Sequence, residues 1–307
     1  MYGSTFKKPI AVVGSINADL VCRVGRIPRS GETLLGSEFR IHPGGKGANQ
    51  AVAAARLGCG VRMIGKLGND AFGAVLRKSM VDAGVDVSGV DTIDEASGVA
   101  LIEVSDAGEN CIVVAPGANA RIAPADIDRQ IDALRQAGLV LAQLEIPLET
   151  ISYLAQICRR ESIPLMLDPA PAQALPDELL RAVTWFTPNE TEAAFYAAAQ
   201  NPDEQYKALF ARGLTGIVLK RGEHGLSLTA PGSQRVDLPA FHVKAVDSTA
   251  AGDAFNGAFA AALMLGSEPV EAARFASAAA AISVTRAGAQ PSMASRDEVD
   301  RFLAQQQ

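Results

Sequence analysis

Residues 139–167 read LVLAQLEIPLETISYLAQICRRESIPLML, and this stretch decides the fold class. Its aliphatic ends, at 139–144 and 164–167, predict two strands, and the amphipathic segment between them, at 151–160, predicts a helix. A strand, a helix and a second strand in this order form a βαβ unit, whose two strands are parallel. The stretch therefore predicts an α/β protein with a mainly parallel sheet.

The same alternation of strands and helices continues on both sides of this stretch. Gly58, Gly84 and Gly138 follow helical segments, where a helix favours a left-handed residue at its C-terminal end. The length of 307 residues favours one large domain over 1–307 rather than two equal ones. The further elements expected are strands at 10–13, 61–64 and 216–219 and helices at 48–57, 72–83, 254–265 and 271–285.

Two segments break the alternation and predict a small β appendage. The runs at 99–105 and 111–115 are joined by DAGEN at 106–110, which is typical of a hairpin. The segment 20–39 has no helical period and could supply further strands. We expect an insertion formed by about 17–40 and 97–116. It is either a lid over a ligand crevice or an edge hairpin without that role, and the periodicity does not decide between them.

The charge balance argues against two classes of partner. The chain has 28 Lys and Arg against 34 Asp and Glu, a formal charge of −6, and no basic run. Nucleic acid and anionic membrane surfaces are therefore not expected as partners. The uncharged stretch at 254–267 is too short to span a bilayer.

The cysteines and the N-terminus suggest a cytoplasmic protein. Lys7 and Lys8 precede only a short apolar run, which predicts a first strand rather than a signal peptide. The three histidines show no metal-ligand spacing. We expect free thiols in a reducing compartment at the four scattered cysteines, Cys22, Cys59, Cys111 and Cys158.

The stretch DSTAAGDAFNGA at 247–258 carries the strongest sign of chemistry. It places small residues, Ala250 to Gly252, and Asp253 at the start of a helix. Unpaired N–H groups and the positive end of the helix dipole meet there, which suits a phosphate or a developing oxyanion. On its own, Asp253 would be interpreted only as an aspartate stabilised by the helix dipole.

The stretch PGGKGANQ at 43–50 opens a helix but matches neither common nucleotide motif. It is not a phosphate-binding loop, because Lys46 is followed by Gly47 rather than Ser or Thr. No GxGxxG pattern fits its glycines, which excludes the dinucleotide fingerprint. What remains is a glycine turn with an ammonium at Lys46 and an amide at Asn49, suited to binding hydroxyl oxygens. Alone, it would be a plain turn.

Polar side chains follow several predicted strands. Asn17 and Asp19 follow the first strand, and Gln143 and Glu145 lie at the end of the strand that begins at Leu139. Asn189 and Glu192 follow an apolar run in the same way. Each could be a helix cap or a solvated turn. Ligands of open α/β sheets bind at the carboxyl ends of strands, so together these residues indicate a binding crevice.

Taken together, these motifs resemble the ribokinase, or PfkB, family of carbohydrate kinases. Within the family the sequence most resembles the ribokinase branch, because it has Ala250 where the family more often has Gly. The resemblance extends over essentially the whole chain. It includes GSINADL at 14–20, PGGKGANQAVAAARLG at 43–58, GENCIVVAPGANA at 108–120, QLEIP at 143–147, LDPAPA at 167–172, TPNETEA at 187–193 and VTRAGAQPS at 284–292.

The resemblance implies a ribokinase-like three-layer α/β/α domain with a small β lid, through which family members form homodimers. It implies phosphorylation of D-ribose by ATP at the 5-hydroxyl, giving D-ribose 5-phosphate and ADP. The alternative is 2-deoxyribose or another furanose or nucleoside as substrate. A different class is a sugar-binding protein or regulator that kept the fold without the chemistry. The intact Asp253 and the small residues before it favour the kinase.

The resemblance also assigns expected roles to residues. Asp253 would be the general base, with Ala250, Ala251 and Gly252 forming a backbone anion hole. The sugar would contact Asn17, Asp19, Gly45, Lys46, Gly47, Asn49, Glu145 and Asp253. ATP would contact Asn189, Lys220, Arg221, Gly222, Glu223, His224, Gly225, Gly252, Asp253 and Ser277.

Two cations are implied by the same resemblance. Mg²⁺ would accompany ATP, with Glu192 contributing through water. K⁺ would bind beside the anion hole at Asp247, Thr249, Ser283, Arg286, Gly288 and Ser292. Lys220 and Arg221 replace the more usual Thr-Leu of the nucleotide turn, which leaves the nucleotide preference open.

Overall fold

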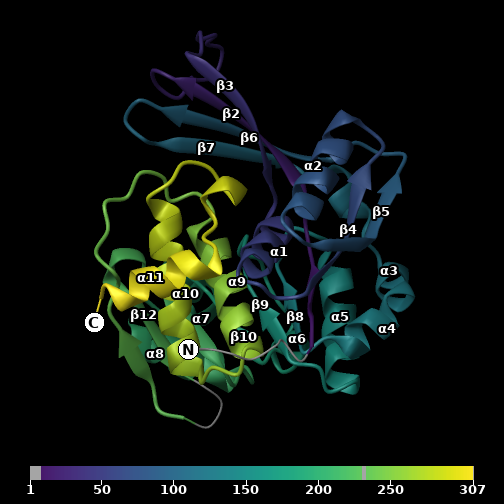
Figure 1. Ribbon diagram of the computed structural model, residues 1–307, viewed down its shortest axis with the longest axis vertical. Coiled ribbons are helices and arrows are strands. Elements are labelled where there is room, and N and C mark those ends of the chain that lie inside the picture. The colour runs from purple at the N-terminus through teal and green to yellow at the C-terminus, as the bar shows by residue number, and fades with distance from the viewer. Residues whose placement is uncertain (1–7, 230–232, 307) are drawn as a thin grey trace.

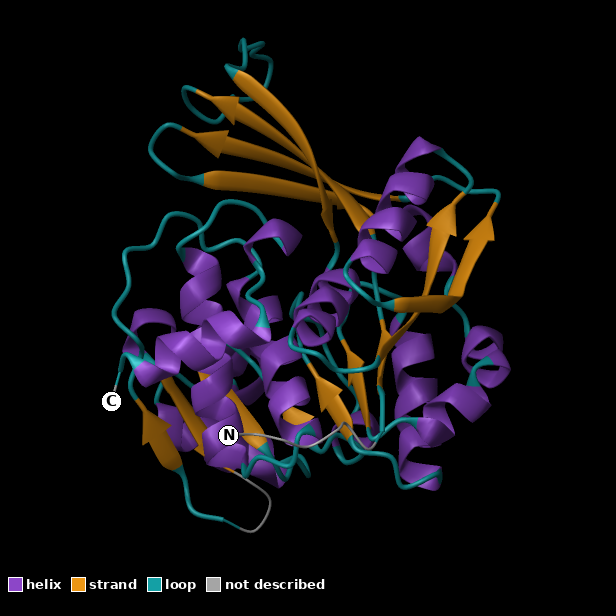
Figure 2. Cartoon of the chain, viewed as in Figure 1, coloured by secondary structure: helices purple, strands orange, loops and turns teal. Residues whose placement is uncertain are grey.

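The computed structural model describes residues 8–229 and 233–306 and consists of a nine-stranded sheet between two layers of helices (Figures 1 and 2). A separate four-stranded sheet projects from one side of the domain. The predicted α/β class and mainly parallel central sheet are confirmed. Residues 1–7, including Lys7 of the predicted N-terminal pattern, lie outside the described part of the chain.

The order of the strands predicts a ligand crevice at the centre of the large sheet. β1 (Ile10–Val13) lies between β4 (Val61–Gly68) and β8 (Leu139–Ala142) and is parallel to both. Early strands extend the sheet on one side of β1 and later strands on the other, which makes the β1–β8 junction a topological switch point. The remaining strands are β5 (Asp86–Ile93), β9 (Leu165–Leu167), β10 (Trp185–Phe186) and β11 (Ile217–Lys220), all parallel, and β12 (Leu226–Thr229) and β13 (Val236–Leu238), which are antiparallel.

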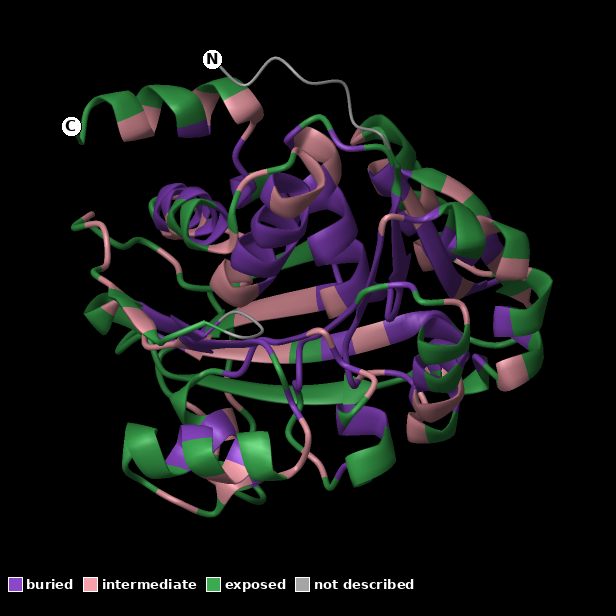
Figure 3. Cartoon of the chain, turned by 90° about the horizontal axis from the view of Figure 1, so that it is seen from below, coloured by how far each residue is buried: buried purple, intermediate pink, exposed green. Residues whose placement is uncertain are grey.

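Two hydrophobic cores cover the two faces of this sheet (Figure 3). Side chains alternate along a strand, so Ile10 and Val12 of β1 enter one core and Ala11 and Val13 the other. The first core is closed by α1 (Lys46–Arg56), α2 (Ala71–Asp82), α9 (Ala251–Met264), α10 (Pro269–Val284) and α11 (Arg296–Ala304). The second is closed by α3 (Pro124–Arg129), α4 (Ile131–Gln136), α5 (Leu148–Arg160), α6 (Asp177–Leu180), α7 (Glu190–Ala197) and α8 (Pro202–Ala211).

The small sheet consists of β2 (Asn17–Val24), β3 (Glu38–Gly44), β6 (Gly98–Ser105) and β7 (Asn110–Ala115), in the order β3-β2-β6-β7. The predicted hairpin is formed by β6 and β7, which pair antiparallel. β3 ends at Gly44, four residues beyond the expected boundary at 40, because it runs directly into the turn before α1. The glycine turn is therefore the base of this sheet.

The two faces of the small sheet have different characters. Asn17 and Asp19 lie on one face of β2, because side chains two apart share a face. The register aligns Ile41, Leu101 and Val113 on the opposite face. Together with Phe39 these side chains are 48–60% exposed. The small sheet thus has a polar end near the crevice and an exposed apolar outer face.

A glycine brings two helices of the first core together. A Cβ atom at Gly257 of α9 would lie 2.6 Å from the Ala53 Cβ atom and from the Gln50 carbonyl of α1. Only glycine allows this approach, which brings the first turn of α1 next to the first turn of α9.

Two expectations from composition can be compared with the described residues. Within 8–229 and 233–306, no helix is long and apolar enough to cross a membrane. Cys22, Cys59, Cys111 and Cys158 are all free, as expected.

Candidate active site

Asp253 lies in the first turn of α9 and is almost fully buried, with 5% of its surface exposed. Its Oδ1 atom accepts a hydrogen bond of 2.9 Å from Gln50 Nε2, and its Oδ2 atom accepts one of 3.0 Å from Asn49 Nδ2. Both donors come from the first turn of α1. The carboxylate is therefore held by two neutral amides rather than by a direct ion pair.

The start of α9 also offers unpaired backbone donors. Ala250 is in the left-handed conformation, with φ 58°, and has no side chain that could cap the helix. The Ala251 N–H donates to the Ser248 carbonyl. The N–H groups of Gly252 and Asp253 have no partner in the described part of the chain. Because the helix dipole is positive at this end, the turn can hold an anion next to the Asp253 carboxylate.

The surroundings shift the titration of this carboxyl group. Burial raises the pKa of Asp253 to about 6, the Lys46 ammonium opposes the shift, and the nearby Asp168 carboxylate adds to it. Asp253 is consequently ionised at neutral pH but remains basic enough to accept a proton.

A second group of polar side chains surrounds the end of β1. Asn119 accepts a hydrogen bond from the Ile16 N–H and donates one of 2.7 Å to Asn17 Oδ1. The Asn17 oxygen is thus occupied, and its amide nitrogen is left to donate. Asn49 is arranged in the opposite way, because its nitrogen is bound to Asp253 and its buried oxygen has no partner among the described residues. Together they offer one donor and one acceptor for a polar ligand.

Charged side chains crowd this part of the crevice. Glu145 Oε2 accepts hydrogen bonds from Ser15 Oγ at 2.5 Å and from the Lys46 N–H at 3.2 Å. Burial, together with the charges of Glu145 and Asp253, raises the pKa of Asp19 to about 7. Burial disfavours the charged form of Lys46, but the carboxylates around it dominate and raise its pKa above the usual value.

Several glycines make room for these polar groups. A Cβ atom at Gly44 would collide with the Asp19 carboxylate, and one at Gly98 would collide with Asn17 and Asn119. A Cβ atom at Gly14 would collide with the Gln143 side chain. Gly45, at φ 87°, lies against the Asn17 N–H, and Gly47 packs on the backbone of Gly14 and Ser15. The glycine turn thus packs directly on the end of β1.

Three buried residues of the crevice, Gln50, Asp168 and Asn119, were not predicted from the sequence. Gln50 donates to Asp253 and to Asp168 Oδ2, and its own oxygen accepts from Gln143. Asp168 follows β9, where the strand-end rule applied to Gln143 and Glu145 could have identified it. Gln50 and Asn119 carried no such signal.

The expected nucleotide residues lie across the crevice from β1. Asn189 and Glu192 form a capping box at the start of α7. The backbone of Asn189 forms an isolated parallel β-bridge with Lys220 at the end of β11. Lys220 Nζ lies 3.3 Å from Asp168 Oδ1. The turn Gly222–His224 is exposed at Glu223 and His224, and Gly225 follows it. Ser277 is half-buried on α10, which packs along α9.

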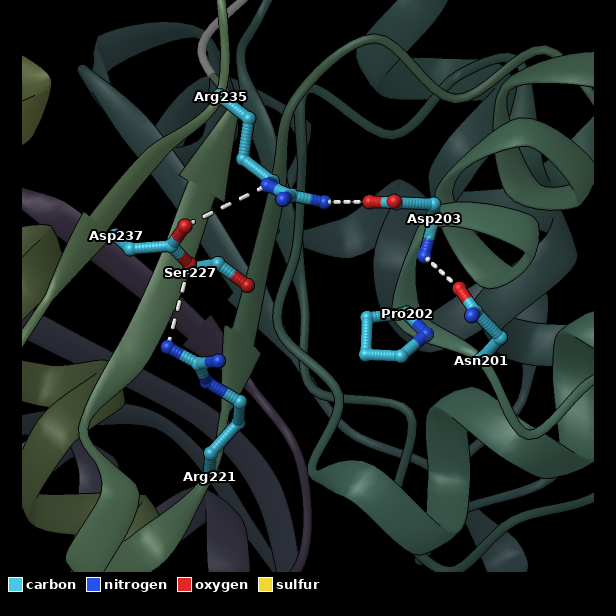
Figure 4. A pocket seen from close by; sticks show the side chains of 7 residues that line it. All are labelled: Asn201, Pro202, Asp203, Arg221, Ser227, Arg235 and Asp237. Carbon is cyan, nitrogen blue, oxygen red and sulfur yellow. Dashed lines mark hydrogen bonds and ion pairs between the residues drawn. The ribbon is translucent and has the colours of Figure 1, made fainter.

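Arg221 points toward Asp237 of β13 (Figure 4). Its guanidinium donates to the Leu226 carbonyl and to Asp237 Oδ1, 3.2 Å away. It lines a separate hollow of about 210 Å³ between α8 and the strands β12 and β13. The charges in this hollow are paired with one another, since Arg235 contacts both Asp203 and Asp237. The side chain of Arg221 is thus not directed to the expected nucleotide site.

The expected monovalent cation residues come from two segments, the loop before α9 and the end of α10 with the chain that follows it, which meet at the Asp247–Gly288 hydrogen bond. Asp247 accepts hydrogen bonds from the N–H groups of Thr249 and Gly288, at 2.9 and 2.8 Å. Burial alone would raise the pKa of Asp247, but these bonds outweigh it and lower the pKa. The side chains of the other three members have partners nearby: Ser283 donates to the Ala280 carbonyl, Ser292 to the Ala289 carbonyl, and Arg286 to Glu298.

Comparison with known proteins gives a consistent result. Residues 7–296 match the family described as pfkB family carbohydrate kinase. A protein of Haemophilus influenzae named ribokinase is 41% identical over 97% of this chain and 99% of its own length. A deoxyribokinase of Salmonella typhi is 36% identical, covering 96% and 98%. The structure of Arabidopsis thaliana ribokinase complexed with ribose and ATP superposes with a TM-score of 0.90 at 33% identity, covering 96% and 98%.

The raised pKa of Asp19 predicts that this carboxylate costs stability. The group titrates near pH 3.8 in an unfolded chain and near pH 7 when folded. Between these values the folded protein retains a proton that the unfolded chain has lost, so the free energy of unfolding falls as the pH rises. Asp19→Asn cannot ionise. It should be more stable than the wild type at pH 8, by about 1–3 kcal/mol, and the difference should shrink towards pH 4.

Urea unfolding of the ligand-free protein at both pH values measures this difference. The exposed Asp94→Asn serves as the control and should be neutral at both. Equal stabilities of Asp19→Asn and the wild type at pH 8 would contradict the expected cost.

Proposed function

Because the chain belongs to the pfkB family of carbohydrate kinases, we propose that it phosphorylates D-ribose at the 5-hydroxyl with ATP, using Asp253 as the general base. It is an ATP-dependent sugar kinase. The observation that carries the assignment of the base is the first turn of α9. There a buried carboxylate held by two amides lies beside unpaired N–H groups, so a base and an anion site share one turn.

The polar groups around the end of β1 are proposed to bind the sugar. A sugar hydroxyl both donates and accepts, and a buried one needs both kinds of partner. Asn17 can donate, and the unpaired oxygen of Asn49 can accept. Asp19, Lys46 and Glu145 add charged partners, and Gly45 and Gly47 allow the ligand to approach the backbone.

In the proposed reaction, Asp253 accepts the proton of the 5-hydroxyl as the oxygen of that hydroxyl bonds to the γ-phosphorus of ATP. The bond from this phosphorus to the bridging oxygen breaks, and ADP leaves with the electron pair. The unpaired N–H groups of Gly252 and Asp253, together with the ammonium groups of Lys46 and Lys220, stabilise the charge on the transferred phosphoryl group. The pKa of Asp253, about 6, suits this role at neutral pH.

A divalent cation fits the charge balance of this crevice. Its named carboxylates, Asp19, Glu145, Asp168, Glu192 and Asp253, outnumber the ammonium groups of Lys46 and Lys220. Burial, and after it the charge of Asp168, raises the pKa of Glu192, although the ammonium groups of Lys220 and Lys46 oppose the shift. Bound with ATP, Mg²⁺ would neutralise phosphate charge, with Glu192 accepting hydrogen bonds from its water ligands. Asn189 and the turn Gly222–His224 would flank the nucleotide.

A monovalent cation is proposed to bind where the turn before α9 meets the end of α10 and the turn after it, at Asp247, Thr249, Ser283, Arg286, Gly288 and Ser292. Asp247 is ionised at neutral pH and has no ion pair within the described residues. Carbonyl oxygens of such a turn are the ligands that K⁺ accepts. A cation there would add positive charge behind the start of α9.

The small sheet is proposed to act as a lid and to pair with a second copy. Its base carries Asn17 and Asp19, and its outer face exposes Phe39, Ile41, Leu101 and Val113. A continuous apolar face on an edge of the molecule favours an interface. A purely monomeric protein in sedimentation experiments would contradict this.

The free cysteines support a cytoplasmic location, which cell fractionation tests.

The substrate is tested by measuring ADP release with D-ribose, 2-deoxy-D-ribose, D-fructose and adenosine, and by locating the phosphate in the product with ³¹P NMR. We expect kcat/KM for D-ribose to exceed the others by at least about tenfold, because a buried group that binds a hydroxyl loses its partner in an analogue without it. A preference for 2-deoxyribose would instead favour the second candidate, suggested by the Salmonella relative.

The role of the base is tested with Asp253→Asn. This change should lower kcat about 10²- to 10⁴-fold and leave the affinities for ribose and ATP within a few-fold of the wild type, as measured by calorimetry. Asp126→Asn is a matched control, because Asp126 is also a buried aspartate in the first turn of a helix, α3. It should retain wild-type kcat. Near-normal turnover by Asp253→Asn would remove Asp253 from its role.

The monovalent cation is tested by replacing K⁺ with Na⁺ at equal ionic strength. We expect kcat/KM to be about fivefold or more higher in K⁺, a typical size for coupling between two sites. Asp247→Ala should abolish the difference, whereas Asp94→Ala should preserve it. Equal rates of the wild type in the two salts would exclude the site.

A further inference from the structure

Gln50 joins two buried carboxylates through a single nitrogen atom. Its Nε2 atom lies 2.9 Å from Asp253 Oδ1 and 2.8 Å from Asp168 Oδ2. Its Oε1 atom accepts a hydrogen bond of 2.7 Å from Gln143 Nε2. Since the oxygen is occupied by a donor, the NH₂ group must face the two carboxylates. The side chain is fully buried, so its orientation is set by these contacts alone.

A cation lies at the far end of the same chain of contacts. Lys220 Nζ is 3.3 Å from Asp168 Oδ1, and their side chains are 16% and 3% exposed. The ammonium also lies beside the anion site, because a Cβ atom at Gly252 would be 3.5 Å from Lys220 Nζ. The contacts therefore run from Lys220 through Asp168 and Gln50 to Asp253.

We propose that Gln50 is a positioning residue for Asp253 and that the charge of Lys220 controls this base through Asp168 and Gln50. The inference deepens the proposed function and rests on Asp253 being the base. Gln50 and Asn49 each hold one carboxylate oxygen, which fixes the plane of the carboxylate and directs its remaining lone pairs.

The charge of Lys220 matters because two carboxylates share one amide. Without the Lys220 ammonium, the negative charge of Asp168 would act more strongly on Asp253 at low local dielectric, and Lys46 would be the ammonium left to oppose it. The other charged groups around the base are Asp19 on β2, Lys46 on α1, Glu145 after β8 and Glu192 on α7. Among the described residues, only Lys220 forms an ion pair with Asp168, so its contribution can be removed separately.

The test is the pH dependence of kcat at saturating ribose and ATP, for the wild type and for Lys220→Met, Asp168→Asn and the double variant. The acid limb of the kcat–pH profile reports the apparent pKa of the base. Lys220→Met should raise this pKa by about 0.5–1 unit, and Asp168→Asn should lower it by a similar amount. In the Asp168→Asn background, adding Lys220→Met should cause no further shift, because the intermediate charge is gone. A Lys220→Met shift that persists in that background would overturn the route through Asp168.

Gln50→Met tests the positioning role. It should lower kcat about 10- to 100-fold and raise the acid limb, with ribose and ADP affinities within about threefold of the wild type. An unchanged acid limb in both Gln50→Met and Lys220→Met would overturn the proposal. If Gln50→Met does not fold, the partly exposed Lys220 still carries the test.

A matched control separates this effect from the general loss of a buried ion pair. Lys66 of β4 pairs with Asp126 at similar burial, 12% and 9%, and its other partner is the Arg121 carbonyl, outside the crevice. Lys66→Met should leave the acid limb in place. The failure of the proposed function would look different, since the wild type would then phosphorylate no sugar or Asp253→Asn would remain active.

Discussion

The Asp253 carboxyl group is buried and yet ionised at neutral pH, and much of the surrounding structure stabilises this charge. A buried carboxylate is costly unless it is hydrogen-bonded, and the helix that carries it supplies only its dipole. The missing donors, Asn49 and Gln50, come from α1. They reach Asp253 because Gly257 lets the two helices approach and because Gly47 lets α1 begin directly on the end of β1. The glycine turn therefore packs α1 against the end of β1, in addition to its proposed contact with the ligand.

The topology then gathers the ligand groups around this carboxylate. The switch point between β1 and β8 opens a crevice at their carboxyl ends, where Asn17, Gln143 and Glu145 emerge. Because β2 continues from β1 and β3 leads into α1, the small sheet is rooted in the same crevice. Asn17 and Asp19 belong to both parts. Two of the residues proposed to bind the sugar therefore also lie at the root of the proposed lid.

The fold class and most elements could be predicted from hydrophobic periodicity and glycine punctuation, since the alternation at 139–167 is formed by β8, α5 and β9. Their ends could not, as with β3, whose length depends on pairing with β2. The structure brings most of the predicted crevice residues together, although their roles stay predictions. Asp168 follows a strand and could have been included. Gln50 could not, because nothing in its local sequence indicates that α9 packs against that turn.

The crowded glycines of the crevice limit how this protein can evolve. At Gly14, Gly44 and Gly98, the space of a β-carbon is already filled by Gln143, Asp19, and Asn17 with Asn119. No mutation can add a side chain at these positions without displacing a polar group of the crevice. A change of specificity is therefore easier at the residues of the crevice that already have a side chain than at these three glycines. Substitution of these glycines is selected against, whereas the polar side chains next to them can be exchanged.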